Sequence, residues 1–541
     1  KELWLNEGFA TWVGNLAVAE FYPEWNIWTS FSSSYFSNAQ SLDSMLTTHP
    51  IEVEVYNSAE IDEIFDAISY CKGASIIRMI ATYLGEEAFK KGLNIYLNRH
   101  QYANATTDDL WKALSESSGK NVKQFMDNWI KRPGLPVLTV KQVDENPNQL
   151  SISQERFLSS GKKATEEQNS IWNCSIGVLT EHTKEPIFIE FNSESQVITL
   201  PDGIVKDSND WIKLNASQSG FFFVNYDSKM LNNLTKAVNE KKLSPLDCIG
   251  LLSDAYSLTK SGRMKTSQLL QLLQGFSNET EYTVIEEIYS SLSAINTIWE
   301  NQPCSDSIRK FAADLVSPTV KRLGWDSKKD DSDLDKLLRV LAISNASKYG
   351  DKDVINEALK RFEQGRESID ADIRRTVYKI AVQHGPEENF EKMKEIFRSA
   401  PMHAEKLQAL SAMGASKDPS LKLKTLEFVV LGDEVRSQDI VYGPSSVNNS
   451  LEGTEIAWNF LKENWETYKT KLAGSGYLLA RCIQYSSSGF LSEERAVEVE
   501  NYFKEHPTPQ AERAIQQTLE SIRSKSAWLN RDKDDVNQYF S

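Results

Sequence analysis

The sequence predicts a mostly helical, multidomain protein in three parts. Apolar residues recur at helical spacing through most of residues 1–133, short alternating segments fill residues 134–227, and helical patterns continue through residues 228–541. A chain of 541 residues normally folds as several domains with sizeable apolar cores. We therefore expect a largely helical first part, a small antiparallel β-sandwich and a large array of helices.

The first part contains three predicted helices and one predicted strand. "GFATWVGNLAVAEF" places Phe9, Val13, Leu16 and Ala17 on one helical face, and "GASIIRMIATYLGEEAF" shows the same spacing. "TTDDLWKALSESSG" begins with Thr and Asp, as helix N-termini do, and stops at Gly119. Apolar and acidic residues alternate in "HPIEVEV", which predicts a short strand.

The second part begins where "RPGLPV" interrupts the helical pattern with two prolines and a glycine. Strand-like segments follow, separated by turn-rich pieces such as "DENPNQ" and "LPDG". These segments are "VLTVKQ", "LSISQERF", "SIWNCSIGVLT", "IFIEF", "QVITL" and "GFFFVNY". Their short, regular spacing indicates a small antiparallel sandwich.

The third part shows apolar stripes at helical spacing. Two of the stripes are Leu334, Leu337, Leu338 and Leu341, and Ile373, Val377, Ile380 and Ala381. Consecutive helices of ordinary length favour stacked helix pairs, a solenoid of the HEAT or armadillo kind, although no strict sequence period is present.

Composition narrows the class of protein. A net charge of −16 argues against nucleic acid or an anionic membrane as the main partner, because both need clustered Lys and Arg. No apolar run is long enough to span a membrane. The cysteines are scattered, with no C-x-x-C pair, so neither a zinc cluster nor a disulfide framework is indicated. A reducing compartment, the cytoplasm, fits best.

Glu7 is the first candidate functional residue. A carboxylate near a helix N-terminus is usually a solvated surface residue. Here apolar residues flank it on both sides, and Gly8 inside a helix costs about 1 kcal/mol in helix propensity. This combination predicts that something approaches the helix closely at Glu7.

Two segments carry a family resemblance. "LWLNEGFATW" resembles the segment that supplies the third zinc ligand in the aminopeptidase N-like zinc exopeptidases, and "IFDAISYCKGASIIRM" resembles their tyrosine segment. "WIKRPGLPVLTV" is similar to their exit from the catalytic domain. Three further segments resemble parts of the family's C-terminal helical domain: "LLSDAYSLTKSG", "VRSQDIVYG" and "AERAIQQTLESIRSKSAWL". The resemblance covers essentially the whole chain and is strongest to the fungal alanine/arginine aminopeptidases.

The resemblance implies a fold, an activity and two site residues. Residues 1–133 would be part of a thermolysin-like catalytic domain, residues 134–227 the sandwich, and residues 228–541 a helical superhelix. Glu7 would be a zinc ligand, and the phenol of Tyr70 would hydrogen-bond the tetrahedral intermediate. The implied activity is the zinc-dependent removal of single N-terminal residues from peptide substrates.

The family's H-E-x-x-H and G-A-M-E-N segments are absent from these 541 residues. By the family's spacing the second zinc-binding histidine would precede Lys1, so we expect the chain to be the C-terminal portion of a larger enzyme. Since one carboxylate cannot hold a catalytic zinc, the chain alone should bind none and be inactive. A second chain or the missing portion would then cover residues 1–20, where Leu3, Trp4, Leu5, Phe9 and Trp12 are apolar.

The alternative is a non-catalytic helical-repeat scaffold that retains a degenerate peptidase segment. Nothing matches the serine-hydrolase or P-loop motifs. Cys71 lacks a neighbouring histidine in the sequence, so we expect a buried, inert thiol. Arg436 and Asp439 are expected to form a structural pair.

Overall fold

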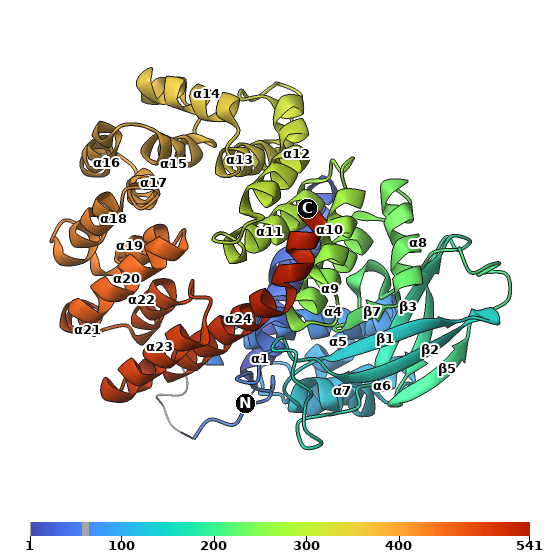
Figure 1. Ribbon diagram of the computed structural model, residues 1–541. Coiled ribbons are helices and arrows are strands. Elements are labelled where there is room, and N and C mark those ends of the chain that lie inside the picture. Colours follow the sequence, from blue (N-terminus) through green and yellow to red (C-terminus); the bar gives the residue numbers. More distant parts are fainter. Residues whose placement is uncertain (1, 57–63) are drawn as a thin grey trace. The chain divides into compact units, whose positions relative to one another are not determined.

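The structure is a computed structural model that describes residues 2–56 and 64–541. The chain forms two compact units, Lys1–Ile288 and Tyr289–Ser541 (Figure 1). The chain is mostly helical and includes small sheets, as predicted, and the first unit carries the sheets. The boundaries predicted for three sequence domains stay a prediction.

The first unit begins with helices. They are α1 (Leu3–Phe21), α2 (Ile27–Phe31), α3 (Ser37–Asp43), α4 (Gly73–Leu84), α5 (Glu86–Arg99), α6 (Thr107–Ser118) and α7 (Val122–Lys131), with π-helical turns η2 (Ser32–Phe36) and η5 (Ile68–Lys72). The predicted limits of α6 are confirmed: Thr106 and Asp109 form a capping box, and Gly119 follows the helix with φ +69°. Gly85, with φ +83°, divides the predicted second helix into α4 and α5.

Two predictions for this region were wrong. Residues 49–56 form no strand, because the segment has no strand to pair with and the amide of Glu52 bonds instead to the carbonyl of Ile130, at 2.9 Å. In α1 the buried residues are Trp4, Gly8 and Trp12, whereas the predicted face is partly exposed. The reason is that α1 packs against η5 and α4 through Gly8.

Two small sheets form the predicted sandwich region. Their strands are β1 (Pro136–Val143), β2 (Asn146–Arg156), β3 (Cys174–Thr180), β4 (Ile187–Phe191), β5 (Ser195–Thr199), β6 (Ile212–Leu214) and β7 (Phe223–Tyr226). The sheet orders are β5-β2-β1-β7 and β4-β3-β6. All pairs are antiparallel except β1 with β7, which is parallel, so the antiparallel prediction fails at that pair. Tyr226 links the sheets, because its hydroxyl accepts a hydrogen bond from the amide of Leu214 at 2.8 Å.

Helices alone follow, as predicted. The first unit adds α8 (Ser228–Asn239), α9 (Pro245–Ser261) and α10 (Thr266–Gly275), and α11 (Tyr282–Ile298) crosses the boundary between the units. The second unit contains α12 (Ser305–Leu323), α13 (Asp333–Lys348), α14 (Lys352–Glu363), α15 (Arg374–His384), α16 (Glu387–Ser399), α17 (His403–Met413), α18 (Pro419–Leu426), α19 (Tyr442–Val447), α20 (Leu451–Glu463), α21 (Trp465–Lys471), α22 (Gly476–Ser487), α23 (Glu493–Glu505) and α24 (Glu512–Phe540).

Helices that are close in sequence pack together through the second unit, as α14 does with α15 and α16 with α17. The long α24 returns to the start of this unit, where Trp528 meets Trp299 edge-on and Phe540 meets Phe311. The helical prediction is confirmed, but a HEAT-like solenoid is not. Of the predicted stripes, Ile373 to Ala381 is buried, whereas Leu337 is 50% exposed.

None of the helices described by the structure is both long enough and apolar enough to span a membrane.

Candidate active site

In the predicted site, the backbone of α1 approaches that of η5 and α4 most closely where these elements cross. A Cβ added to Gly8 would lie 3.0 Å from the carbonyl carbon of Gly73, and one added to Gly73 would lie 3.3 Å from the Cα of Gly8. Both neighbours are backbone atoms, which cannot rotate aside. Glycine therefore explains why two backbones meet here, as the position of Gly8 beside Glu7 predicted.

The crossing brings together the two predicted site residues. Glu7 precedes Gly8 on α1, and Tyr70 lies three residues before Gly73 on η5. Both are half-buried, and they are close enough for the Glu7 carboxylate to act on the phenol. Burial, followed by the neighbouring Glu7 carboxylate, raises the pKa of Tyr70. The phenol is therefore a neutral donor at pH 7, held against a carboxylate.

The turn that carries Tyr70 is fastened to the rest of the unit by a buried ion pair. Lys72 is fully buried, and its Nζ lies 2.8 Å from Oδ2 of Asp43, which is also fully buried. Asp43 Oδ1 accepts from the amide of Gly134 at 2.9 Å and from the hydroxyl of Thr48 at 3.0 Å. No local pattern in the sequence predicts this pair, because Asp43 and Lys72 are far apart in the chain.

Two protein-family models match this chain. The model of the peptidase family M1 domain matches residues 1–129, and that of the ERAP1-like C-terminal domain matches residues 211–524. The chain belongs to the M1 peptidase family, with an ERAP1-like C-terminal domain. The crossing of Gly8 and Gly73 thus lies within the M1 peptidase domain, and the helical second unit lies largely within the ERAP1-like domain.

Curated relatives resemble almost all of the chain. Aminopeptidase M1-A of Oryza sativa subsp. japonica is 36% identical over 99% of this chain and 61% of its own length. In Saccharomyces cerevisiae, "Aminopeptidase 2, mitochondrial" is 35% identical over 99% of this chain and 56% of its length. The yeast alanine/arginine aminopeptidase is 34% identical over 99% of this chain and 62% of its length. This M1 chain thus spans less than two thirds of the length of these relatives.

The described residues do not make a zinc site by themselves. Within residues 2–56 and 64–541 no group of three His, Cys, Asp or Glu side chains is arranged to hold a metal ion. A catalytic zinc needs three protein ligands, and Glu7 is a single carboxylate. In the same described ranges, Glu7 forms no ion pair with a Lys, Arg or His side chain. Its charge is therefore balanced by no cation there.

The other sequence candidates have structural roles. Cys71 is buried, and burial followed by the charge of Asp66 raises the pKa of its thiol to about 11, as expected for an inert cysteine. Arg436 and Asp439 form the predicted pair, with Nε 3.0 Å from Oδ2.

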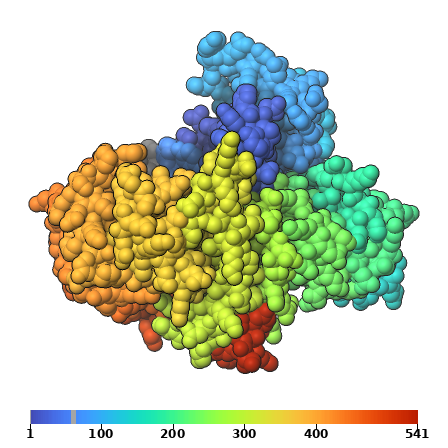
Figure 2. Space-filling view, turned by 90° about the horizontal axis from the view of Figure 1, so that it is seen from above, coloured from blue at the N-terminus to red at the C-terminus, as the bar shows by residue number. Residues whose placement is uncertain are grey.

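The outer face of α1 is a second feature of this region. Trp4 and Trp12, which were expected to face a missing partner, are buried in this chain against Trp111 and Phe89. The reason is again the close crossing at Gly8, which turns both indoles inward. The N-terminal segment, dark blue in Figure 2, lies at the surface of its unit. Its exposed apolar side chains include Val13, Leu16 and Phe21.

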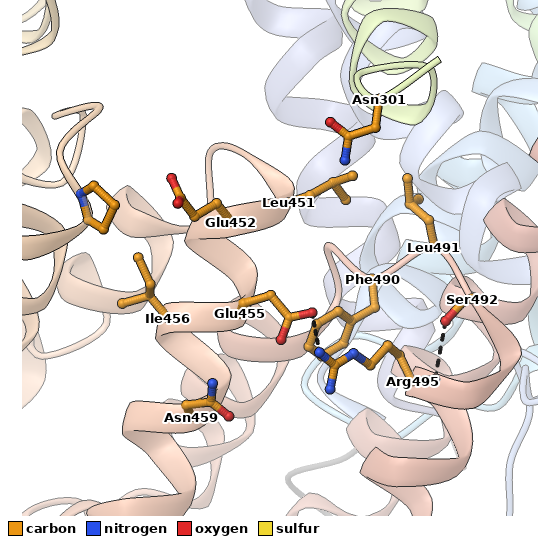
Figure 3. Close-up of a pocket in the computed structure, with 11 residues that line it drawn as sticks. Asn301, Leu451, Glu452, Glu455, Ile456, Asn459, Phe490, Leu491, Ser492 and Arg495 are labelled. Atoms are coloured by element: carbon orange, nitrogen blue, oxygen red, sulfur yellow. Dashed lines mark hydrogen bonds and ion pairs between the residues drawn. The ribbon is translucent and has the colours of Figure 1, made fainter. Parts of the chain in front are cut away.

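A groove of about 600 Å³ lies within the second unit. Leu451 and Ile456 of α20 form one wall, with Phe490 and Leu491 before α23 opposite (Figure 3). Figure 3 also shows Glu455 paired with Arg495 across it. Besides these apolar side chains and the ion pair, Glu452, Asn301 and Asn459 also line the groove.

Proposed function

We propose that this chain supplies part of the active site of a metallo-aminopeptidase that removes single residues from the N-termini of peptides. The observation that carries the proposal is that Glu7 and Tyr70 are neighbours at the glycine crossing. Further support comes from relatives named as aminopeptidases over almost the whole chain.

Each residue of the pair has a proposed role. Glu7 is the one zinc ligand that this chain contributes, and the remaining ligands and the general base come from residues outside these 541. Within the described part of the chain no cation pairs with Glu7, and this supports the role, because a partly buried carboxylate is stabilised by a cation. Tyr70 donates its phenolic hydrogen to the oxygen that becomes negative as the peptide carbonyl is attacked.

The test compares Glu7 with Glu20, an exposed carboxylate on the same helix. In the whole protein we expect one zinc per molecule and hydrolysis of alanyl or arginyl amides. Glu7→Ala should lose both, and Glu20→Ala neither. The 541-residue chain alone should hold no stoichiometric zinc and hydrolyse nothing above background. A Glu7→Ala protein that keeps zinc and activity would refute the proposal.

The exposed apolar face of α1 supports a further part of the proposal. We propose that the rest of the whole protein, or a second copy of the chain, covers this face around Val13, Leu16 and Phe21. The cytoplasm is the proposed location, because the five cysteines are free and buried. One yeast relative carries "mitochondrial" in its name, so cell fractionation decides the location.

Non-catalytic binding is a second candidate function, and the groove of the second unit favours it. If the groove binds peptides, Ile456→Asp should weaken the binding of a fluorescent apolar peptide to the 541-residue chain. Leu337→Asp, at an exposed position of the same unit, should not. Equal binding by both variants would remove the groove from consideration.

A further inference from the structure

The π-helical turn that carries Tyr70 is capped by Asp66. Oδ1 of Asp66 accepts hydrogen bonds from the amides of Ile68, at 2.8 Å, and Ser69, at 3.3 Å. These amides lie at the start of the turn, where no earlier carbonyl of the turn can accept from them. Because these bonds fix the start of the turn, the direction of the Tyr70 side chain depends on where Asp66 is held.

Asp66 is in turn held by His49. The Nε2 atom of His49 lies 2.8 Å from Oδ2 of Asp66, and Nδ1 lies 2.8 Å from the carbonyl oxygen of Pro50. Both partners only accept hydrogen bonds, so both bonds form together when the imidazole carries both protons. His49 is only 7% exposed, which leaves the ring little room to move. The buried ring of His49 therefore holds one oxygen of the cap while the other oxygen binds the turn.

The segment that carries His49 is anchored as well. Thr48, its neighbour, donates to Asp43 at 3.0 Å, and Asp43 pairs with Lys72 at 2.8 Å. Tyr70 thus lies between two hydrogen-bonded pairs. Asp66, before it in the chain, binds His49, and Lys72, after it, binds Asp43. The neighbours Thr48 and His49 connect the two pairs, because Thr48 binds Asp43. Neither pair touches the phenol itself, so both act by fixing the backbone that carries it.

We propose that His49 is a positioning residue for Tyr70, holding the Asp66 cap so that the phenol stays against Glu7. The inference rests on the proposed role of Tyr70. It extends that role to a histidine that the sequence did not single out, because His49 and Asp66 come together only in the folded chain.

The experiment uses the 541-residue chain and needs no activity. Tyrosine is replaced by 3-fluorotyrosine, and Tyr70→Phe assigns the ¹⁹F resonance of Tyr70. His49→Ala should shift or broaden that resonance and speed hydrogen exchange at the amides of Ile68 and Ser69 by roughly tenfold or more. His49→Gln, which keeps a side-chain donor, should restore part of both effects. His182→Ala is the matched control, because it removes another His–Asp pair of the same unit, with Nε2 3.0 Å from Oδ2 of Asp210.

The outcomes separate this inference from the proposed function. An unchanged Tyr70 resonance in folded His49→Ala overturns the inference, and so does an equal change in His182→Ala. If His49→Ala does not fold, Asp66→Asn decides: it keeps an acceptor for the amides but loses the charge, and a Tyr70 resonance that stays in place would be the overturning result. In the whole protein, His49→Ala should lower kcat with little change in KM. Absence of aminopeptidase activity in the unsubstituted whole protein would count against the proposed function, while the ¹⁹F result would still decide the role of His49.

Discussion

Each of the two units places a glutamate against a tyrosine, but the ion pairing of the glutamate differs between the units. In the second unit, Oε1 of Glu405 on α17 accepts from the hydroxyl of Tyr378 on α15 at 3.1 Å. Arg366 adds two hydrogen bonds to the same carboxylate, at 2.8 and 3.0 Å. In the first unit, Glu7 adjoins Tyr70, and no ion pair to Glu7 is present among the described residues.

This difference separates a structural pair from a candidate site. Glu405 is 4% exposed, and its bonds to Arg366 are the first cause of its lowered pKa. A carboxylate bound in this way by an arginine is less available to a ligand. No cation among residues 2–56 and 64–541 pairs with Glu7 at the glycine crossing, so a cation or a polar substrate group can still bind it. Both residues are glutamates. They differ because Arg366 binds Glu405, whereas no arginine among the described residues pairs with Glu7.

The largest expected effect comes from replacing the tyrosine of each pair, Tyr70 or Tyr378. In the whole protein, Tyr70→Phe should lower kcat by roughly 10²–10³ with little change in KM, as for a lost oxyanion donor. Tyr378→Phe removes the same hydroxyl from the structural pair and should leave kcat unchanged. Steady-state kinetics on an alanyl amide measures both. Full kcat in Tyr70→Phe would mean that the phenol does no catalytic work.

The next effect concerns the glycine crossing. Gly8→Ala should destabilise the contact of α1 with α4 by about 1–3 kcal/mol, because the added Cβ meets backbone at 3.0 Å. Gly14→Ala on the same helix meets nothing within 4 Å and should stabilise α1 by up to about 1 kcal/mol. Hydrogen exchange of α1 and α4 amides measures each change. Equal stability of the two variants would show that the helices can separate without cost.

Local patterns explain what the sequence predicted well. Thr106 and Gly119 mark the ends of α6 because a cap depends on only a few neighbouring residues. The combination of Glu7 with Gly8 indicated a close approach for the same kind of reason, since glycine inside a helix has a cost that packing must offset. Tyr70 was reached only through family resemblance, because one tyrosine among 19 has no distinguishing local pattern.

Long-range contacts explain what the sequence did not predict. The alternation in "HPIEVEV" is the pattern of a strand, but a strand needs a partner, and Glu52 bonds to the end of α7 instead. The face of α1 was misjudged because its partner at Gly73 is distant in sequence. The same reason explains why two pairs were not predicted, His49 with Asp66 and Lys72 with Asp43. Each pair joins residues that no local spacing connects.

The smallest expected effect comes from replacing the glutamate of each pair, Glu405 or Glu7. Glu405→Gln should destabilise α15 and α17 by about 1–2 kcal/mol at pH 7, because it weakens charge-assisted bonds to Arg366. Glu7→Gln should change stability by no more than about 0.5 kcal/mol, since no cation among the described residues is lost.

The folded-state pKa of Glu405 is lowered, so its contribution to stability is present above the unfolded pKa of about 4.3 and is lost as pH falls through the folded pKa. The difference between Glu405→Gln and the unsubstituted chain should therefore shrink below about pH 4. Hydrogen exchange of the two helices at pH 7 and pH 3 measures it, and a difference that persists at pH 3 would show that Glu405 acts through shape rather than charge.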